Sequence, residues 1–280
     1  MHTPRTGRLL VRLGLHAIVP LAVAYLVIRF LTDPTRISVG ELSANYLLMH
    51  DRPFFRDAPG DELRNAIGAS AILLVVAMAW ATSLGVGAGF AYAWSSNRRF
   101  RAVAWTLGTI AASLPGFFWA VAVELVMIFL WLRFGVRPFP IAGFGIDDHL
   151  VLPALALGLR PAAYIFRLTA LAVGDARHAD YVRTAVGKGI GERRLLARHV
   201  LPNVLPNIVT ATVLATRGAL SGLVIIEYVY VWGGAGLGFV QALGNSRLEL
   251  AGELALAFAV ASVLLTVTAE AARARVPSAA

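Results

Sequence analysis

The sequence predicts an all-α membrane protein with six transmembrane helices and a short cytoplasmic helix between the fourth and the fifth. The composition favours this class: of 280 residues, 58% are hydrophobic and only 15% are charged, whereas a soluble domain carries about a quarter charged residues. The mean hydropathy is +0.70. The apolar residues also form long runs, and Ala66 to Asn97 holds no charge, which is enough chain to cross a hydrocarbon core of about 30 Å as a helix.

Six apolar runs are long enough to span a membrane with some tilt, and only a helix satisfies its own backbone groups inside lipid. The predicted spans are about Leu13–Phe30, Ala66–Trp94, Ala102–Leu132, Leu150–Val173, Leu205–Trp232 and Leu250–Ala271. We expect the first to remain as a span, because no small-residue cleavage site follows its apolar run.

Basic residues are concentrated in alternate connections, which predicts that both termini are cytoplasmic. The predicted organisation is a cytoplasmic N-terminus at 1–12, a transmembrane domain at 13–272 and a cytoplasmic tail at 273–280. Two connections are long: an outer loop at 31–65 and a basic cytoplasmic loop at 174–203. With this distribution, the net charge of +9 favours topology control and anionic lipid over nucleic acid.

The cytoplasmic loop has the pattern of two short helices around a glycine turn. Asp175 is expected to cap the first helix, whose apolar residues recur at helical spacing and predict one apolar face. These residues are Tyr181, Val182, Ala185 and Val186. The turn is predicted at Gly187, Gly189 and Gly191, and the second helix at Glu192 to His199, before Pro202 and Pro206 lead into the fifth span. The first helix suits either docking into a groove of another protein or lying on lipid headgroups.

This loop resembles the EAA-type loop of ABC importer permeases of the dipeptide, oligopeptide and nickel class. The matching segments are Tyr181–Ala185, Lys188–Gly189, Glu192–Arg194, Arg198–His199 and Leu201–Asn203. Similar segments elsewhere are Leu114–Trp119, Leu152–Leu157, Arg167–Thr169, Ile225–Glu227 and Gly236–Gly238. The resemblance therefore covers most of the chain, from Leu9 to about Ala271.

The resemblance implies one permease subunit of an ATP-driven importer in the bacterial inner membrane. The implied partners are a second homologous permease, two ABC ATPase subunits and an extracytoplasmic solute-binding protein. ATP and magnesium would be bound by the ATPases, with no cofactor and no catalytic residue in this chain. The residues expected to couple to the ATPase are Tyr181, Val182, Thr184, Ala185, Lys188, Gly189, Glu192 and His199.

Ionisable residues inside the predicted spans are candidates for a translocation path, since each costs at least about 2.5 kcal/mol at mid-membrane and needs a partner or water. We expect Glu124 and Arg160 either to meet the charged termini of a peptide-like substrate or to form a structural ion pair. Glu227 is expected to have a structural or gating role. The full set of path candidates is Pro115, Phe118, Trp119, Glu124, Arg160, Arg217 and Glu227.

Other classes find little support in the sequence. There is no cysteine, and the six histidines lack metal-binding spacing. Gly187-Lys188-Gly189 lacks the upstream glycine and the Ser or Thr of a phosphate-binding loop. The alternative function is a self-sufficient secondary transporter or channel, which would need inverted repeats and ion ligands near mid-membrane.

Overall fold

The structure is a computed structural model that describes residues 59–274, and every regular element in that range is helical. In chain order the elements are α3 (Pro59–Trp94), α4 (Arg98–Ser113), α5 (Gly116–Phe134), the 3-10 turn η1 (Asp148–Leu150), α6 (Val151–His178), α7 (Asp180–Gly187), α8 (Glu192–Leu195), the π-helical turn η2 (Leu196–Val200), α9 (Leu201–Val229), α10 (Ala235–Gly244) and α11 (Leu248–Ala274). The predicted span Leu13–Phe30, most of the outer loop and most of the C-terminal tail lie outside the described residues.

Five helical stretches within residues 59–274 are long and apolar enough to cross a membrane. They are Leu63–Trp94, Gly116–Phe134, Asp148–His178, Leu196–Val229 and Leu248–Thr268. They correspond to the second to sixth predicted spans, so the all-α membrane class is confirmed. The count of six stays a prediction, because its first span lies outside the described part of the chain.

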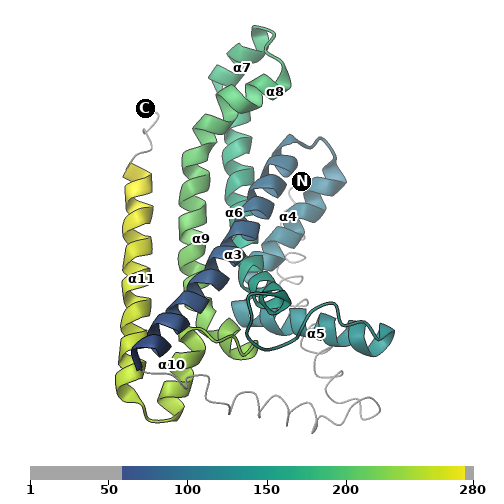
Figure 1. The fold of residues 1–280 in the computed structure, drawn as a ribbon. Helices are drawn as coiled ribbons and strands as arrows, with labels where there is room; N and C mark the ends of the chain where they lie inside the picture. Colours follow the sequence, from purple (N-terminus) through teal and green to yellow (C-terminus); the bar gives the residue numbers. More distant parts are fainter. Residues whose placement is uncertain (1–58, 275–280) are drawn as a thin grey trace, which may run out of the picture. The chain divides into compact units, whose positions relative to one another are not determined.

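The third predicted span, a single helix over 102–132, is wrong. The chain forms two helices there, α4 and α5, and breaks at Leu114 and Pro115, both of which have extended backbone angles. The physical reason is the proline: its ring disfavours helical angles at the preceding residue. After the break α5 leaves the direction of α4 (Figure 1).

Helix α6 is the centre of the bundle, since it packs against α3, α4, α5 and α9. Helices α10 and α11 pack on α9 and on the beginning of α3. Figure 1 shows α7, α8, the α3–α4 turn and the end of α11 at one end of the bundle, and α10 with the beginning of α3 at the other. The connections that the distribution of basic residues assigned to the cytoplasm therefore lie at the same end of the bundle. Which side of the membrane this end faces stays a prediction.

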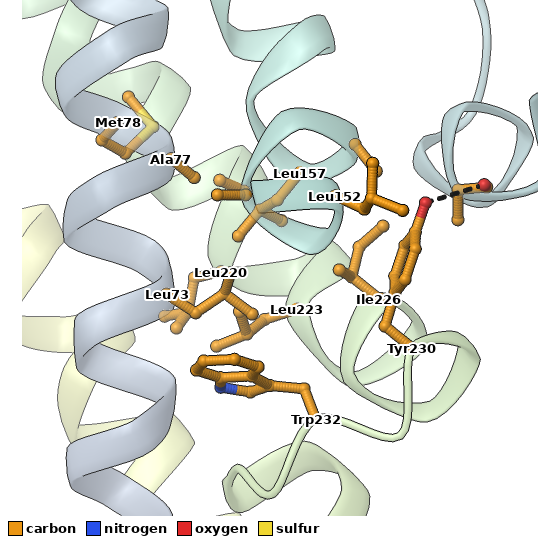
Figure 2. Packing of buried hydrophobic residues seen from close by; sticks show 14 of the residues in the cluster. Leu73, Ala77, Met78, Leu152, Leu157, Leu220, Leu223, Ile226, Tyr230 and Trp232 are labelled. Atoms are coloured by element: carbon orange, nitrogen blue, oxygen red, sulfur yellow. Dashed lines mark hydrogen bonds between the residues drawn. The ribbon is translucent and has the colours of Figure 1, made fainter. Parts of the chain in front are cut away.

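The main core lies where α3, α6 and α9 meet (Figure 2). Trp232, Leu73 and Leu223 are almost completely buried there. The Tyr230 hydroxyl donates to the carbonyl of Ala120 at 3.0 Å, and the Trp232 indole N–H donates to the carbonyl of Ala69 at 3.1 Å. These two bonds connect the segment after α9 to α5 and α3.

Small residues allow α3 and α6 to approach closely. A Cβ atom on Gly85 would lie 2.7 Å from the Ala162 carbonyl oxygen, and one on Gly89 would lie 2.6 Å from the Thr169 Cβ. Gly87 has no such neighbour within 4 Å in the described structure. Gly85 and Gly89 therefore form the close contact, and Gly87 does not.

This difference predicts opposite effects of alanine at neighbouring positions of one helix. Gly89→Ala should lower the free energy of unfolding by about 1–3 kcal/mol, because the added methyl group overpacks the α3–α6 contact. The matched Gly87→Ala should be neutral or stabilising by up to about 1 kcal/mol, because alanine favours the helix and meets no neighbour. Thermal unfolding of the purified variants in detergent measures both, and equal destabilisation would contradict the assigned contact.

Candidate functional site

The first candidate site is the loop between α6 and α9. Helix α6 continues to His178, and extended angles at Ala179 separate it from α7. Gly189 has a left-handed φ of 73°, its N–H donates to Val186, and the N–H of Ile190 donates to Ala185. This is a glycine C-cap that closes α7. The predicted glycine turn is confirmed, but Asp175 lies inside α6 and does not cap α7.

The apolar residues of α7 differ in burial. Val182 and Ala185 are each 4% exposed and pack in a cluster with Val173, Leu195 and Val200. Tyr181 and Val186 are instead 41% and 57% exposed. At about 100° per residue the four lie within one arc of the helix, so the predicted single face forms. Helices α6 and α8 and the turn η2 cover its middle and leave one apolar residue exposed at each edge.

The segment after the turn also differs from the prediction of a separate helix over Glu192–His199. Helix α8 ends at Leu195 and passes through the π-helical turn directly into α9. Pro202 fits because it lies at the start of α9, where its missing N–H is not needed. His199 lies in the π-helical turn, and its carbonyl accepts the Asn203 side-chain amide at 2.7 Å.

Trp94, the last residue of α3, connects this loop to the bundle, and the sequence analysis did not anticipate it. Its indole N–H donates to the Glu192 carboxylate at the start of α8. Arg177 of α6 donates to the Ala93 carbonyl, and its guanidinium lies 4.6 Å from the centre of the Trp94 ring. Contacts of this kind hold the end of α3 to the loop through Glu192 and to the end of α6 through Arg177.

The second candidate site is a cavity of about 490 Å³ between the α4–α5 break, α6 and α9. Two of the path candidates, Pro115 and Arg160, line it together with Phe117 and Tyr164. Phe118 and Trp119 do not line it. The Trp119 indole N–H instead donates to the Ala111 carbonyl at 3.2 Å, which connects α5 to α4 across the break.

Two other ionisable candidates lie away from this cavity. Arg217 lines a second cavity of about 720 Å³ between α9 and α11. Glu124 lines neither cavity, and its buried Oε1 has no hydrogen-bond partner among the described residues. Neither Glu124 nor Arg160 forms an ion pair within residues 59–274, so the structure does not bring these two predicted partners together.

Glu227 is fully buried and belongs to a polar cluster at the beginning of α10. Its carboxylate accepts the backbone N–H groups of Gly236 at 2.6 Å and Leu237 at 3.2 Å, and the Ser70 hydroxyl at 2.5 Å. The Ser70 oxygen in turn accepts the N–H of Ala235 at 2.8 Å. A carboxylate is well placed at the N-terminus of a helix, where free N–H groups and the helix dipole favour negative charge.

Glycine is required around this carboxylate. A Cβ atom on Gly234 would overlap the Glu227 carboxyl group, and one on Gly236 would lie 2.8 Å from its Oε2. The geometry supports a structural role for Glu227, since the cluster connects α9, α10 and α3. Ser70, which lies 157 residues away in sequence, is a member that no local pattern indicated.

The described chain is thus a bundle of long apolar helices with a cavity beside Arg160 and an ordered helical loop at one end. The chain belongs to the family of binding-protein-dependent transport system inner membrane components, whose model matches residues 81–278. The resemblance stated from the loop motifs is thereby confirmed.

Individual relatives agree with this assignment. The chain is 31% identical to the oligopeptide transport system permease OppB of Mycobacterium bovis, over 74% of this chain and 67% of that protein. It is 27% identical to the dipeptide permease DppB of Alkalihalophilus pseudofirmus, over 65% of this chain and 62% of the relative. It is 29% identical to the glutathione permease GsiC of Escherichia coli, over 63% and 56%. The matched region thus spans less than two thirds of the length of the dipeptide and glutathione permeases.

A solved structure shares the fold. A chain of an amino acid ABC transporter crystallised with histidines superposes with a TM-score of 0.58 over 77% of this chain and 94% of that one, at 15% identity. This similarity concerns the fold alone.

The Glu227 cluster predicts a large effect from removing one hydroxyl. Ser70→Ala should destabilise the protein by about 1–3 kcal/mol, because it removes a donor from a buried carboxylate and an acceptor from the Ala235 N–H. Ser83→Ala is the matched control on the same helix, since that hydroxyl is exposed and bonds only to its own turn. Denaturation in detergent compares them, and an equal effect would argue against the cluster as a stabilising element.

Proposed function

We propose that this chain is the permease subunit of an ATP-driven importer for peptide-like substrates, that it forms half of the translocation path and that it couples to separate ATPase subunits through residues 175–203. Membership of the binding-protein-dependent family supports the transport role. The dipeptide, oligopeptide and glutathione permeases among its relatives support a peptide-like cargo.

The observation that carries the coupling proposal is the partial burial of the apolar face of α7. Its middle is fixed, since Val182 and Ala185 are buried against the bundle. Its two edges present Tyr181 and Val186 to the outside, and exposed apolar side chains in such a position suit contact with a protein. Thr184, Lys188, Gly189 and Glu192 are also exposed in this loop.

The contacts behind α7 would carry its movement into the membrane. The Trp94–Glu192 hydrogen bond joins the loop to α3, and the Arg177 contacts join the ends of α3 and α6. In this proposal, closure of an ATPase dimer displaces α7, and the displacement reaches both helices because α3 is held to the loop and α6 is held to α3.

The translocation path is assigned to the cavity that Pro115 and Arg160 line, with Arg217 in the neighbouring cavity. Glu124 stays a path candidate because its buried oxygen lacks a partner in the described structure. Phe118, Trp119 and Glu227 are assigned to the packing that surrounds the path.

The assembly proposed for this chain has four kinds of component besides itself and lipid. They are a second homologous permease, two ABC ATPase subunits, a solute-binding protein at the outer face, and ATP with magnesium held by the ATPases. The proposed location is the bacterial inner membrane, with both termini in the cytoplasm.

A charge placed at the exposed edge of the apolar face of α7 tests the coupling proposal. Val186→Asp should lower the amount of ATPase recovered with this chain in a mild-detergent pull-down by on the order of tenfold or more, because an unpaired carboxylate buried in an apolar contact costs several kcal/mol. Val186 is preferred to Gly189 for this purpose, since a side chain at Gly189 would also strain the left-handed turn.

Val136→Asp is the control for this pull-down. Val136 follows α5 and is 53% exposed, and it lies outside the proposed coupling loop, so this variant should recover as much ATPase as the wild type. Equal recovery with Val186→Asp would refute the role of α7. A well-folded wild-type chain that recovers no ATPase would favour a self-sufficient transporter.

A further inference from the structure

The cavity between the α4–α5 break, α6 and α9 carries a single kind of charge. Among the residues that line it, Arg160 is the only one that is charged at neutral pH. The remaining wall is mostly apolar, with the Tyr164 and Ser221 hydroxyls as further polar groups. A mostly apolar cavity with a few convergent polar groups is the usual form of a small-molecule site.

Arg160 has no protein partner in the described structure. Arg160 is exposed at the cavity, and within residues 59–274 its guanidinium makes no hydrogen bond and no ion pair. Its helix is long and apolar enough to span a membrane. An arginine within such a span needs an anion, a carbonyl group or water, and its planar group binds a carboxylate through two parallel hydrogen bonds. The unsatisfied group is therefore a donor set that fits a carboxylate.

A second donor lies beside it. Tyr164 is one helical turn after Arg160 on α6, which places the two side chains on the same face. Its side chain is 37% exposed, and its hydroxyl has no hydrogen-bond partner among the described residues. The Ser221 hydroxyl is different, because it already donates to the Gly218 carbonyl at 2.8 Å on its own helix.

The opposite wall leaves room for a ligand. Gly218 and Gly222 of α9 and Gly116 of α5 line the cavity, and a Cβ atom at any of them would meet nothing within 4 Å in the described structure. The small residues keep a space of about 490 Å³ in front of the two donors. That volume is within the range of sites that hold a compound of a few hundred daltons.

We propose that this cavity binds the carboxylate of the imported substrate, with Arg160 as its cationic partner and Tyr164 as a hydroxyl donor. The proposal rests on the function proposed above and names the chemical group that the path recognises. The site selects the anionic end of a peptide and not its ammonium end, because no acidic residue lines the cavity and Glu124 lies away from it.

The test compares two cargoes that differ only in this group. The complete importer, reconstituted in proteoliposomes with its ATPases, second permease and binding protein, is given radiolabelled trialanine or trialanine amide, and the ratio of their ATP-dependent uptake rates is measured. If the binding protein prefers one of the two peptides, this preference affects the uptake ratio of every permease variant equally. A change in the ratio between variants therefore belongs to the permease.

Arg160→Gln should lower the acid-to-amide ratio by on the order of tenfold, because a charge-assisted hydrogen bond to a carboxylate is lost. Arg160→Lys should keep most of the ratio. Arg133→Gln is the matched control, since it removes the same charge from the last turn of α5, away from both cavities, and should leave the ratio unchanged.

An unchanged ratio in Arg160→Gln, with uptake of both peptides reduced alike, would overturn the proposal and indicate that Arg160 pairs with an acid of the second permease. If Arg160→Gln does not assemble, Tyr164→Phe decides: a ratio lowered several-fold supports the site and an unchanged ratio overturns it. A different outcome would refute the proposed function itself: a wild-type assembly that imports neither peptide or recruits no ATPase. In that case the carboxylate site would be refuted with it.

Discussion

The close contact of α6 with α3 is the constraint on which the rest of the structure depends. Lipid tails are as apolar as leucine, so membrane helices associate through tight van der Waals packing and buried polar contacts. Gly85, Gly89 and Gly158 provide that fit, because a methyl group on any of them would overlap the facing helix. The same helix α6 then carries Arg160 into the cavity and Arg177 to Trp94, which bonds to the loop, so both candidate sites take their positions from this contact.

Buried polar groups fix the opposite end of the bundle. The Glu227 carboxylate gathers donors from α3 and from the beginning of α10, while Trp232 and Tyr230 bond to backbone carbonyls of α3 and α5. Inside a membrane, such groups have little water to turn to, so each must find its partner within the protein. The cluster therefore determines how the chain reverses after α9.

Much of the fold could be predicted from the sequence because hydropathy and proline or glycine chemistry are local. The long apolar runs predicted the spanning helices, and Gly189 predicted the turn after α7. The break at Pro115 was also local, yet the continuous apolar run around it concealed the proline's effect on Leu114. Helical periodicity predicted the apolar face of α7, but it could not predict that Val182 is buried against the bundle while Tyr181 is exposed.

The missed contacts join residues that are distant in sequence. Trp94 and Glu192 are 98 residues apart, and Ser70 and Glu227 are 157 apart. Each pair depends on the register of α3 against another helix, which is set by the fit of glycines and not by any pattern around the paired residues. The ion pair that was one of the two alternatives for Glu124 and Arg160 was likewise based only on their opposite charges. The positions of their helices do not bring the two side chains together.

Helix α6 reaches both candidate sites, which has a physical consequence for the coupling proposed above. Arg160 and Arg177 are separated by 17 positions, or about 25 Å along an α-helix at 1.5 Å per residue. Pro161 lies between them inside α6 and removes one backbone hydrogen bond next to Arg160. In the proposed coupling, a displacement that reaches Arg177 would be carried by regular helix up to the cavity, and α6 would bend most easily at Pro161, next to the cavity charge.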